Sequence, residues 1–384
     1  MSTEQSGSRG ISRRTLLLSS GAGALAVGAA GAAAFAVGST TTDAAASAEP
    51  AVAAAGHHQA GISRPQTPQR HCLITVGTLS AATLQSSLSA LGAAITRMTD
   101  PDDPVQHVTP GGPGNLSVTV GLGTAALAGT AHPSLADAVE LPLFRGDATL
   151  PVARRGGDIV LSVNSDDPMI LEPVRGELLA AIDGFAPTWS ELCFRGPAED
   201  GVARNPFGYL DGIIRPRTSE ELAESVWITE GPLAGGTICV IRRFQLDTIE
   251  FRALPSGDRD QIIGRRQSDG SPLSGGGRDD HVDLNAKTAA GELLVSAHAH
   301  ARAAHPSFTG SPLMLRRSYS YRASEVDHGH MFISYQNDVQ AFARTQLRLD
   351  DMDDLMTYVT PTATAAFAIL PGFETDRPLG ASLF

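Results

Sequence analysis

The same order of strand-like and helix-like segments occurs twice along the chain, and this repeat is the strongest constraint on its fold. In the first half, the alternating apolar segment GDIVLSVNSDDP (157–168) precedes the helix-like segment 169–182. In the second half, HMFISYQND (330–338) has the same texture and also precedes a helix-like segment. We therefore expect two similar α+β halves, each an antiparallel sheet with helices on one face.

Other segments fit this scheme and set the expected boundaries. Further strands are expected over 71–77, 115–123 and 235–247, and helices over 80–95 and 256–266. The Gly-rich segment 269–287 is expected to be a long surface loop. Residues 49–70 are rich in Ala, Gln, Pro and Gly, so we interpret them as a disordered linker, in which His57 and His58 have no role.

Residues 1–48 resemble a twin-arginine export signal. Arg13 and Arg14 precede an apolar stretch rich in Ala, Gly and Leu, and the small residues ASA (46–48) form a cleavage site. The alternative is a membrane anchor over 15–37, but its Gly and Ala content makes it a weak transmembrane segment. The resemblance implies the twin-arginine translocase as a partner, an extracellular or cell-envelope location, and a protein that loads a cofactor before export.

The charge and cysteine content exclude several classes of protein. The 29 basic and 41 acidic residues give a net charge of −12, which argues against nucleic acid as a partner. The three cysteines are widely spaced and form no CxxC pattern, so we expect buried thiols. An exported chain without a disulfide framework is consistent with folding in a reducing compartment.

Three of the eleven histidines lie in SAHAHARAAHPSF (296–308). If 296–304 is helical, His298 and His300 point about 200° apart and cannot bind one metal together. The run HARAA favours a helix, and Pro306 ends it at or before His305. The pattern therefore favours one functional histidine, whereas a strand would allow a zinc site built on HAH.

Two further segments carry candidate site residues. FGYLDGI (207–213) places Asp211 between glycines, which permit unusual backbone angles and close approach to a flat ligand. LMLRRSYSY (313–321) places Arg316 and Arg317 on opposite faces of a strand, so that one of them can point inward, where it needs an anionic partner. The alternatives are an ordinary turn acid and an edge strand with both arginines in solvent.

In order and spacing, GYLDG, AHARAAHPS and LMLRRSYSY are similar to motifs of the dye-decolorizing peroxidases, haem enzymes of the dimeric α+β-barrel type. The resemblance covers nearly everything from His71 to Phe384 and includes the exported branch with iron-uptake-associated members. It implies two ferredoxin-like halves, 71–200 and 201–384, with heme b (iron protoporphyrin IX) bound mainly by the C-terminal half. The function that the resemblance implies is that of a haem-dependent peroxidase. The alternative is a deferrochelatase-like, haem-handling or iron-acquisition protein with weak peroxidase activity.

The resemblance assigns roles residue by residue. His300 is the implied iron ligand, Asp211 the distal acid and Arg316 the distal arginine, with Arg317 as the fallback. The other implied cofactor contacts are Gly208, Gly212, Arg302 and Phe332. The acidic run 349–355 could supply a carboxylate partner for His300, although we favour a solvated face.

The resemblance also implies the substrates, hydrogen peroxide and small aromatic or dye reductants. Asp211 would move the proton of the peroxide and Arg316 would stabilise the departing oxygen. Electrons could pass through Trp189, Trp227 or a tyrosine, which the sequence does not rank. The sequence leaves homo-oligomer formation open. Tyr209, where Phe is usual, and IIRP (213–216), where Thr and Asn are common, depart from the family and put substrate access in doubt.

We expect the double variant Arg13→Lys, Arg14→Lys to accumulate as precursor in the cytoplasm, because the twin-arginine route depends on the paired guanidinium groups. Cell fractionation followed by immunoblotting measures this. Continued export of the double variant would contradict the twin-arginine interpretation.

Overall fold

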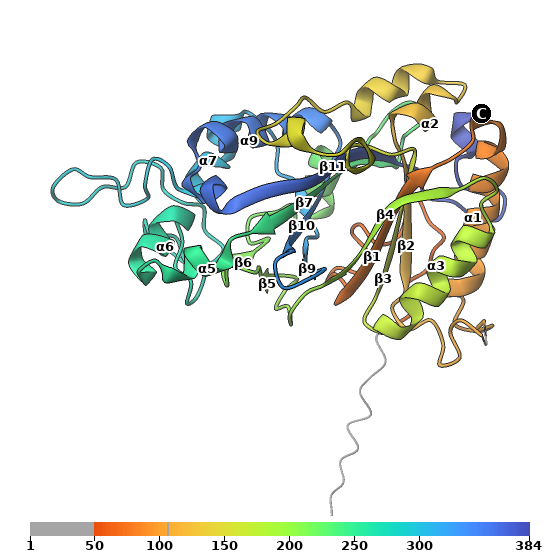
Figure 1. Ribbon diagram of the computed structural model, residues 1–384, viewed down its shortest axis with the longest axis horizontal. Helices are drawn as coiled ribbons and strands as arrows, with labels where there is room; N and C mark the ends of the chain where they lie inside the picture. The colour runs from red at the N-terminus through yellow and green to blue at the C-terminus, as the bar shows by residue number, and fades with distance from the viewer. Residues whose placement is uncertain (1–49, 106) are drawn as a thin grey trace, which may run out of the picture. The chain divides into compact units, whose positions relative to one another are not determined.

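The computed structural model describes residues 50–105 and 107–384, and in this part the main strands form a closed ring (Figure 1). The ring order is β7, β11, β2, β3, β1, β4, β9, β10, and β10 pairs again with β7 to close it. All these pairs are antiparallel. The strands are β1 (His71–Thr78), β2 (Ser117–Leu122), β3 (Ile159–Ser165), β4 (Ala186–Phe194), β7 (Thr237–Leu246), β9 (Tyr319–Arg322), β10 (His328–Gln336) and β11 (Val359–Ile369).

Each half contributes four strands in the same topology. The N-terminal half has the order β2-β3-β1-β4, and the C-terminal half has β11-β7-β10-β9. Each order is that of a ferredoxin-like unit, which confirms the expected α+β fold with two ferredoxin-like halves. The short strand β8 (Leu315–Arg316) precedes β9 and pairs with the next part of β10.

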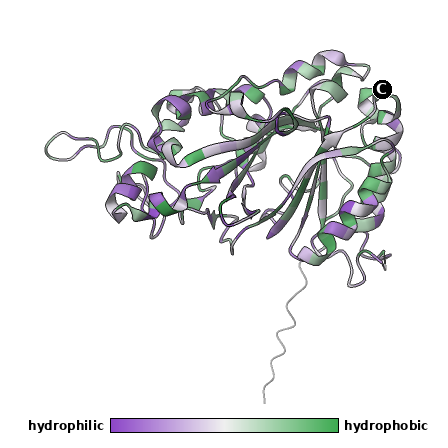
Figure 2. Cartoon of the chain, in the orientation of Figure 1, coloured by the Kyte–Doolittle hydropathy of each residue, from purple (hydrophilic) through white to green (hydrophobic). Residues whose placement is uncertain are grey.

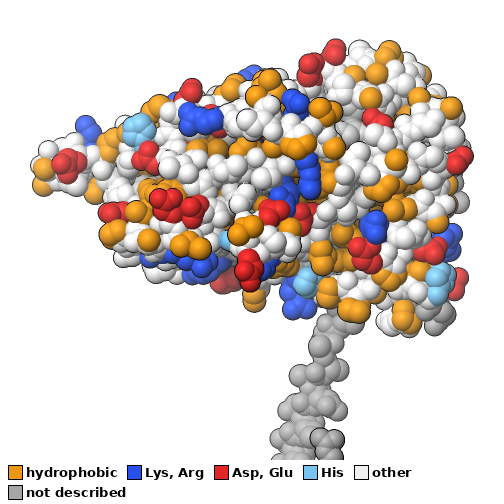
Figure 3. Space-filling model, in the orientation of Figure 1, with side chains coloured by type: hydrophobic (Ala, Val, Ile, Leu, Met, Phe, Trp, Pro, Cys, Tyr) orange, Lys and Arg blue, Asp and Glu red, His pale blue; other side chains and the backbone are white. Residues whose placement is uncertain are grey.

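Helices cover the outside of the ring in both halves. In α1, Leu84, Leu88, Leu91 and Ile95 recur at helical spacing and are buried, which gives this helix distinct hydrophobic and hydrophilic sides (Figure 2). The helices are α1 (Leu84–Thr99), α2 (Thr124–Ala128), α3 (Leu171–Ala180), α4 (Ser219–Ser225), α5 (Thr248–Ala253), α6 (Ser256–Ile263), α7 (His300–Ala303), α8 (Pro306–Thr309) and α9 (Val339–Met352). On the face drawn in Figure 3, acidic and basic side chains are interspersed.

The inside of the ring is a separate hydrophobic core. It contains alternate residues of the strands, among them Met331, Ile333 and Tyr335 of β10. All three cysteines lie in this core as free thiols, as expected, and burial raises the pKa of Cys72 to about 12. Such thiols are inert at neutral pH.

Residues 50–70 differ from the disordered linker that the sequence suggested. They form no helix or regular strand, but Ile62 is fully buried inside the ring. The side chain of Gln59 donates to the carbonyl oxygens of Val120 (2.8 Å) and Leu370 (2.9 Å) and accepts from the N–H of Val120. His58 stacks on Trp227 with ring centroids 3.7 Å apart. The composition of this segment resembles that of disordered linkers, and the contacts that order it cannot be seen in the local sequence because they are made to distant parts of the chain.

Some elements differ from those expected. Strands β4 and β11 had not been expected. Helix α7 begins only at His300, so residues 296–299 are not helical. The long segment 264–299 between α6 and α7 is a loop that projects from the rest (Figure 1). The export signal lies outside the described residues. Within 50–105 and 107–384, no helix has the length and hydrophobicity needed to cross a membrane.

A buried ion pair fixes the loop before β3 to β7. Arg242 donates to both carboxylate oxygens of Asp147, at 2.7 and 3.0 Å, and both side chains are only 1% exposed. The guanidinium also lies 4.8 Å from the ring centroid of Phe144. Burial lowers the pKa of Arg242, so its charge depends on this partner.

We expect Asp147→Asn to lower the free energy of unfolding by about 3–5 kcal/mol, because it leaves the Arg242 charge buried without a counter-charge. Chemical denaturation monitored by circular dichroism measures this. The control is Glu172→Gln, which removes the exposed ion pair with Arg175 and should cost less than about 1 kcal/mol. Equal unfolding midpoints for the two variants would contradict the expectation.

Candidate active site

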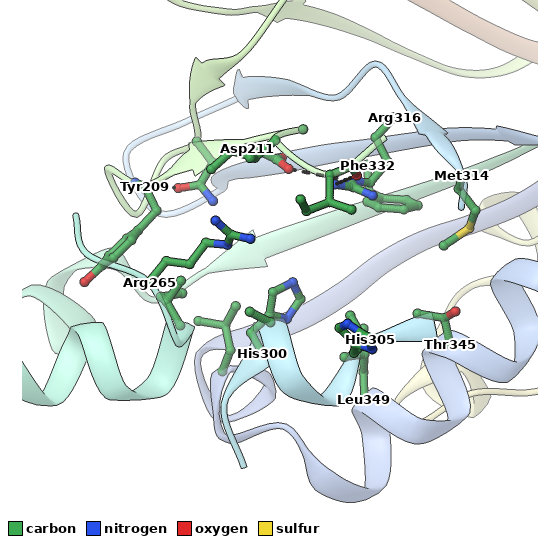
Figure 4. Close-up of a pocket in the computed structure, with 18 of the residues that line it drawn as sticks. Tyr209, Asp211, Arg265, His300, His305, Met314, Arg316, Phe332, Thr345 and Leu349 are labelled. Atoms are coloured by element: carbon green, nitrogen blue, oxygen red, sulfur yellow. Dashed lines mark hydrogen bonds and ion pairs between the residues drawn. The ribbon is translucent and has the colours of Figure 1, made fainter. Parts of the chain in front are cut away.

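An apolar cavity of about 260 Å³ lies in the C-terminal half, between β10 on one side and α7 and α9 on the other (Figure 4). Most of its walls are large hydrophobic side chains, and a few polar groups converge on it, as in small-molecule and cofactor sites. Large apolar side chains in its walls include Phe207, Phe244, Met314, Phe332, Phe342 and Leu349.

One wall presents the imidazole of His300, which stands at the first residue of α7. Its Nδ1 lies 2.6 Å from Oδ2 of Asp353, whose side chain is fully buried. Oδ1 of Asp353 accepts from the N–H of Leu355, which fixes the carboxylate in turn. The His300 side chain is 39% exposed and lines the cavity, so Nδ1 is anchored and Nε2 remains for a ligand.

The charge on this wall follows from the same contact. Burial would lower the pKa of His300, but the charge and hydrogen bond of Asp353 outweigh it and raise the pKa. A carboxylate in this position also fixes the tautomer and makes the imidazole a stronger metal ligand. Asp353 belongs to the acidic run 349–355, for which a solvated face was favoured, and that preference is wrong for this residue.

The two neighbouring histidines have other roles. His298 lies outside the cavity, and its Nδ1 is 3.0 Å from the carbonyl oxygen of Met352. His305 lines the cavity, but its Nδ1 accepts from the N–H of Ser307 and caps α8. Among the described residues no group of three or more His, Cys, Asp or Glu could hold a metal, so a zinc site built on HAH lacks its further ligands.

The opposite wall carries a carboxylate, Asp211, between the side chains of Arg316 and His330. Asp211 ends the short strand β6 (Leu210–Asp211), and its Oδ1 lies 3.8 Å from Nε of Arg316. Its Oδ2 lies 3.5 Å from Nε2 of His330 on β10. Figure 4 shows Asp211, Arg316 and Phe332 on one side of the cavity and His300 on the other.

These neighbours keep Asp211 ionised. Burial alone would raise its pKa, but the charges of His330, Arg316, His300 and Arg195 outweigh burial, so the pKa lies below the usual range for a carboxyl group. The group can therefore accept a proton in mildly acidic solution.

The adjacent arginines point in opposite directions, as expected for a strand. Arg316 lines the cavity and also donates to the carbonyl oxygen of Ile214 (3.0 Å). Arg317 is buried and donates to the carbonyl oxygens of Ile62 (2.6 Å) and Pro65 (2.8 Å) in the N-terminal segment. The structure therefore brings Arg316 to the site, and Arg317 is not needed as the fallback.

Of the remaining expected contacts, Gly212 and Phe332 line the cavity, whereas Gly208 and Arg302 do not. Arg302 donates to the carbonyl oxygen of Leu284 (2.6 Å), because two residues along the short helix α7 turn it away from the direction of His300. Gly208 adopts φ 89° in the turn that leads to Asp211. Neither residue lines the empty cavity, and the haem contacts expected of both stay predictions.

Sequence reasoning gave no role to Arg265 or His330, and it did not favour Asp353. Arg265 lines the cavity and is buried, and its guanidinium donates to the carbonyl oxygens of Gly270, Arg278 and Asp280. Among the described residues it forms no ion pair within 4.0 Å, and burial lowers its pKa to about 10. An unneutralised buried cation suits an anionic group of a ligand. The arginine pair of IIGRR was visible in the sequence, but its burial was not.

Together these walls fit a flat, mostly apolar cofactor with a metal at its centre. Such a cofactor needs only one strong protein ligand, and Nε2 of His300 is oriented for it. Apolar side chains suit its faces, and Arg265 suits an acidic substituent. The opposite side retains an ionised carboxylate and an arginine, the groups needed for proton transfer and charge stabilisation.

Comparisons with known proteins agree with this geometry. Residues 202–374 match the family described as Dyp-type peroxidase, C-terminal. The dye-decolorizing peroxidase of Thermobifida fusca is 35% identical over 294 residues, covering 71% of this chain and 68% of the relative. The deferrochelatase of Yersinia pestis is 28% identical over 368 residues, covering 83% and 81%.

A solved structure has the same fold. The oxyferrous complex of DtpA from Streptomyces lividans superposes with a TM-score of 0.80 at 26% identity, covering 88% of this chain and 98% of that one. The fold, the cavity and these relatives lead to one conclusion: the chain belongs to the dye-decolorizing peroxidase family, and its predicted activity as a peroxidase is confirmed.

Proposed function

We propose that this chain reduces hydrogen peroxide at a haem b held by His300 and oxidises small aromatic or dye reductants. The observation that carries the proposal is that His300 and the pair Asp211–Arg316 face one apolar cavity from opposite walls. Haem would supply the redox centre when bound, and His300 would be the protein ligand of its iron. Arg265 is the residue best suited to its carboxylates.

The residues of the distal wall have separate tasks. Asp211 accepts a proton from one oxygen of the peroxide and returns it to the other, so that water can leave. Arg316 stabilises the negative charge that develops on the departing oxygen. Phe332 and the other apolar side chains exclude water, which strengthens both effects.

A second candidate function follows from the relatives. The deferrochelatases match more of this chain than the dye-decolorizing peroxidase does, 83% against 71%. A deferrochelatase-like protein would release iron from haem and leave the porphyrin. Incubation with haem under reducing conditions, followed by fluorescence detection of iron-free porphyrin, distinguishes this function from peroxide turnover.

The place of action is also a proposal. The paired Arg13 and Arg14 with the following apolar segment support export by the twin-arginine translocase, and therefore an extracellular or cell-envelope location.

We expect His300→Ala to abolish stable haem binding, because the variant lacks the protein ligand whose Nδ1 is anchored by Asp353. Asp353→Asn should retain haem with affinity weaker by roughly 10- to 100-fold, the usual effect of removing a partner of a metal ligand. Haem titration followed at the Soret band measures both. His298→Ala and His305→Ala are the controls and should bind haem normally. Loss of haem from His298→Ala alone would contradict the assignment.

We expect Arg316→Leu to slow the reaction with peroxide by roughly 100- to 1,000-fold, equivalent to about 3–4 kcal/mol of charge stabilisation. Asp211→Asn should also slow it, since the amide cannot accept the proton. Stopped-flow mixing of the haem-loaded protein with peroxide measures both rates. Arg317→Leu is the comparison, and a slow Arg317→Leu beside an unaffected Arg316→Leu would move the assignment by one residue.

The pH dependence follows from Asp211. Its lowered pKa means that the ionised base persists into acid and is lost only when the pH falls through that pKa. We therefore expect dye oxidation to be strongest at roughly pH 3–5, with the acid limit set by Asp211 protonation. An acid limit above about pH 6 would show that a histidine is the base instead.

A further inference from the structure

His330 occupies a position in the distal wall that the mechanism above does not use. It lies on β10, two residues before Phe332, and its side chain is only 16% exposed. It lines the main cavity together with Asp211 and Arg316, and also a small adjoining polar pocket that includes Arg195, Ser318 and Tyr319. Asp211 and Arg316 line this second pocket as well, so all three residues stand where the two spaces adjoin.

The two ring nitrogens of His330 have different surroundings. Nε2 lies 3.5 Å from Oδ2 of Asp211, within ion-pair distance. Nδ1 is buried and has no hydrogen-bond partner among the described residues. Because an ionised carboxylate only accepts hydrogen bonds, the proton of the neutral ring belongs on Nε2, facing Asp211. Contacts of this length in a ligand-free site commonly tighten when substrate binds.

The two oxygens of Asp211 are thereby assigned to different partners. Oδ1 faces Arg316 and Oδ2 faces His330, so the plane of the carboxylate is set from two strands, β8 and β10. Ion-pair contacts at both oxygens favour one orientation of the carboxylate, although neither contact is as short as a hydrogen bond. Such a bias favours a productive orientation toward a bound peroxide.

We propose that His330 is a positioning residue for the peroxide reaction, which holds Oδ2 of Asp211 through Nε2 and forms with it one proton-holding pair. This inference rests on the proposed function, since it assumes that Asp211 is the acid–base group. When the imidazole of His330 is protonated on both nitrogens, it is a cation. The carboxylate of Asp211 then lies between two cations, His330 and Arg316.

The charged groups around the ring determine when this state forms. Burial lowers the pKa of His330, Asp211 raises it, and Arg195, His300 and Arg316 lower it, so the pKa lies below the usual value for histidine. Below that pKa the imidazolium stands beside Asp211 and favours its ionised form. Above it the ring is neutral and only the N–H contact remains. His330 therefore has its largest effect on the ionisation of Asp211 in acid.

The test compares His330→Leu with the wild-type protein, both loaded with haem, from pH 3 to pH 8. We expect the acid limb of the peroxide reaction to move upward by about one pH unit, because the neighbouring cation is lost and the pKa of Asp211 rises. Cyanide binding gives a measurement without turnover, since hydrogen cyanide must give up its proton to bind. Its affinity should fall in acid by up to about tenfold.

His330→Gln separates the two parts of the proposal. Its amide can still donate to Oδ2 but cannot become charged, so we expect the same shift of the acid limb with a nearly wild-type rate at neutral pH. His328→Leu is the matched control: His328 lies on the same strand outside the cavity, where its ring contacts Thr248 and Glu325. Its pH profile should be that of the wild type.

Two results would overturn the proposal. The first is an acid limb in His330→Leu that superposes on the wild-type limb. The second is an equal loss of rate at every pH in both His330 variants, which would show that the ring only packs. Melting temperature and haem content verify folding. If Asp211→Asn itself reacts at the wild-type rate, the proposed function fails, and that outcome is distinguishable because it does not involve His330.

Discussion

The alternation of side chains along β10 is the constraint on which the rest of the structure depends. Met331, Ile333 and Tyr335 point into the ring and fill its core, whereas His330 and Phe332 line the cavity. The same strand closes the ring by pairing with β7. A slip of one residue would place His330 and Phe332 inside the core. The register that closes the barrel therefore also places these side chains in the cavity. Gly329 permits the close approach, since a Cβ there would lie 2.0 Å from the carbonyl oxygen of Phe244.

Each of the two walls places an aspartate beside a histidine, but the two aspartates have different roles. On the His300 side, the carboxylate of Asp353 is fully buried and both its oxygens are occupied, at 2.6 and 2.9 Å, so it can only orient the imidazole. On the other side, Asp211 has longer contacts of 3.5 and 3.8 Å and opens onto the cavity, so it can exchange a proton. Contact length and burial thus decide which carboxylate is structural and which is available for acid–base chemistry.

The sequence predicted what depends on local pattern, and failed where distant segments decide the outcome. Periodicity identified β1, β2, β3, β7 and β10, but β11 contains Pro361 and many small residues and lacks a strand signal. The family resemblance singled out His300, Asp211 and Arg316, and all three line the cavity. Asp353 was not favoured because an acidic run is usually solvated, but it is buried where the end of α9 meets His300 of α7. No local pattern connects His330 to Asp211, since their strands meet only through the tertiary fold.

The segment 50–70 shows why adjacent arginines are needed at the end of β8. Arg317 enters the ring and binds the carbonyl oxygens of Ile62 and Pro65, while Ile62 fills the core beside it. Burial lowers the pKa of Arg317 to about 10, and it depends on these carbonyls to satisfy its charge. Because Arg316 directly precedes Arg317 in the chain, the contacts that hold Arg317 also help to fix the backbone from which Arg316 reaches Asp211. A segment without regular secondary structure, distant in sequence from the cavity, therefore contributes to the preorganisation of the distal wall.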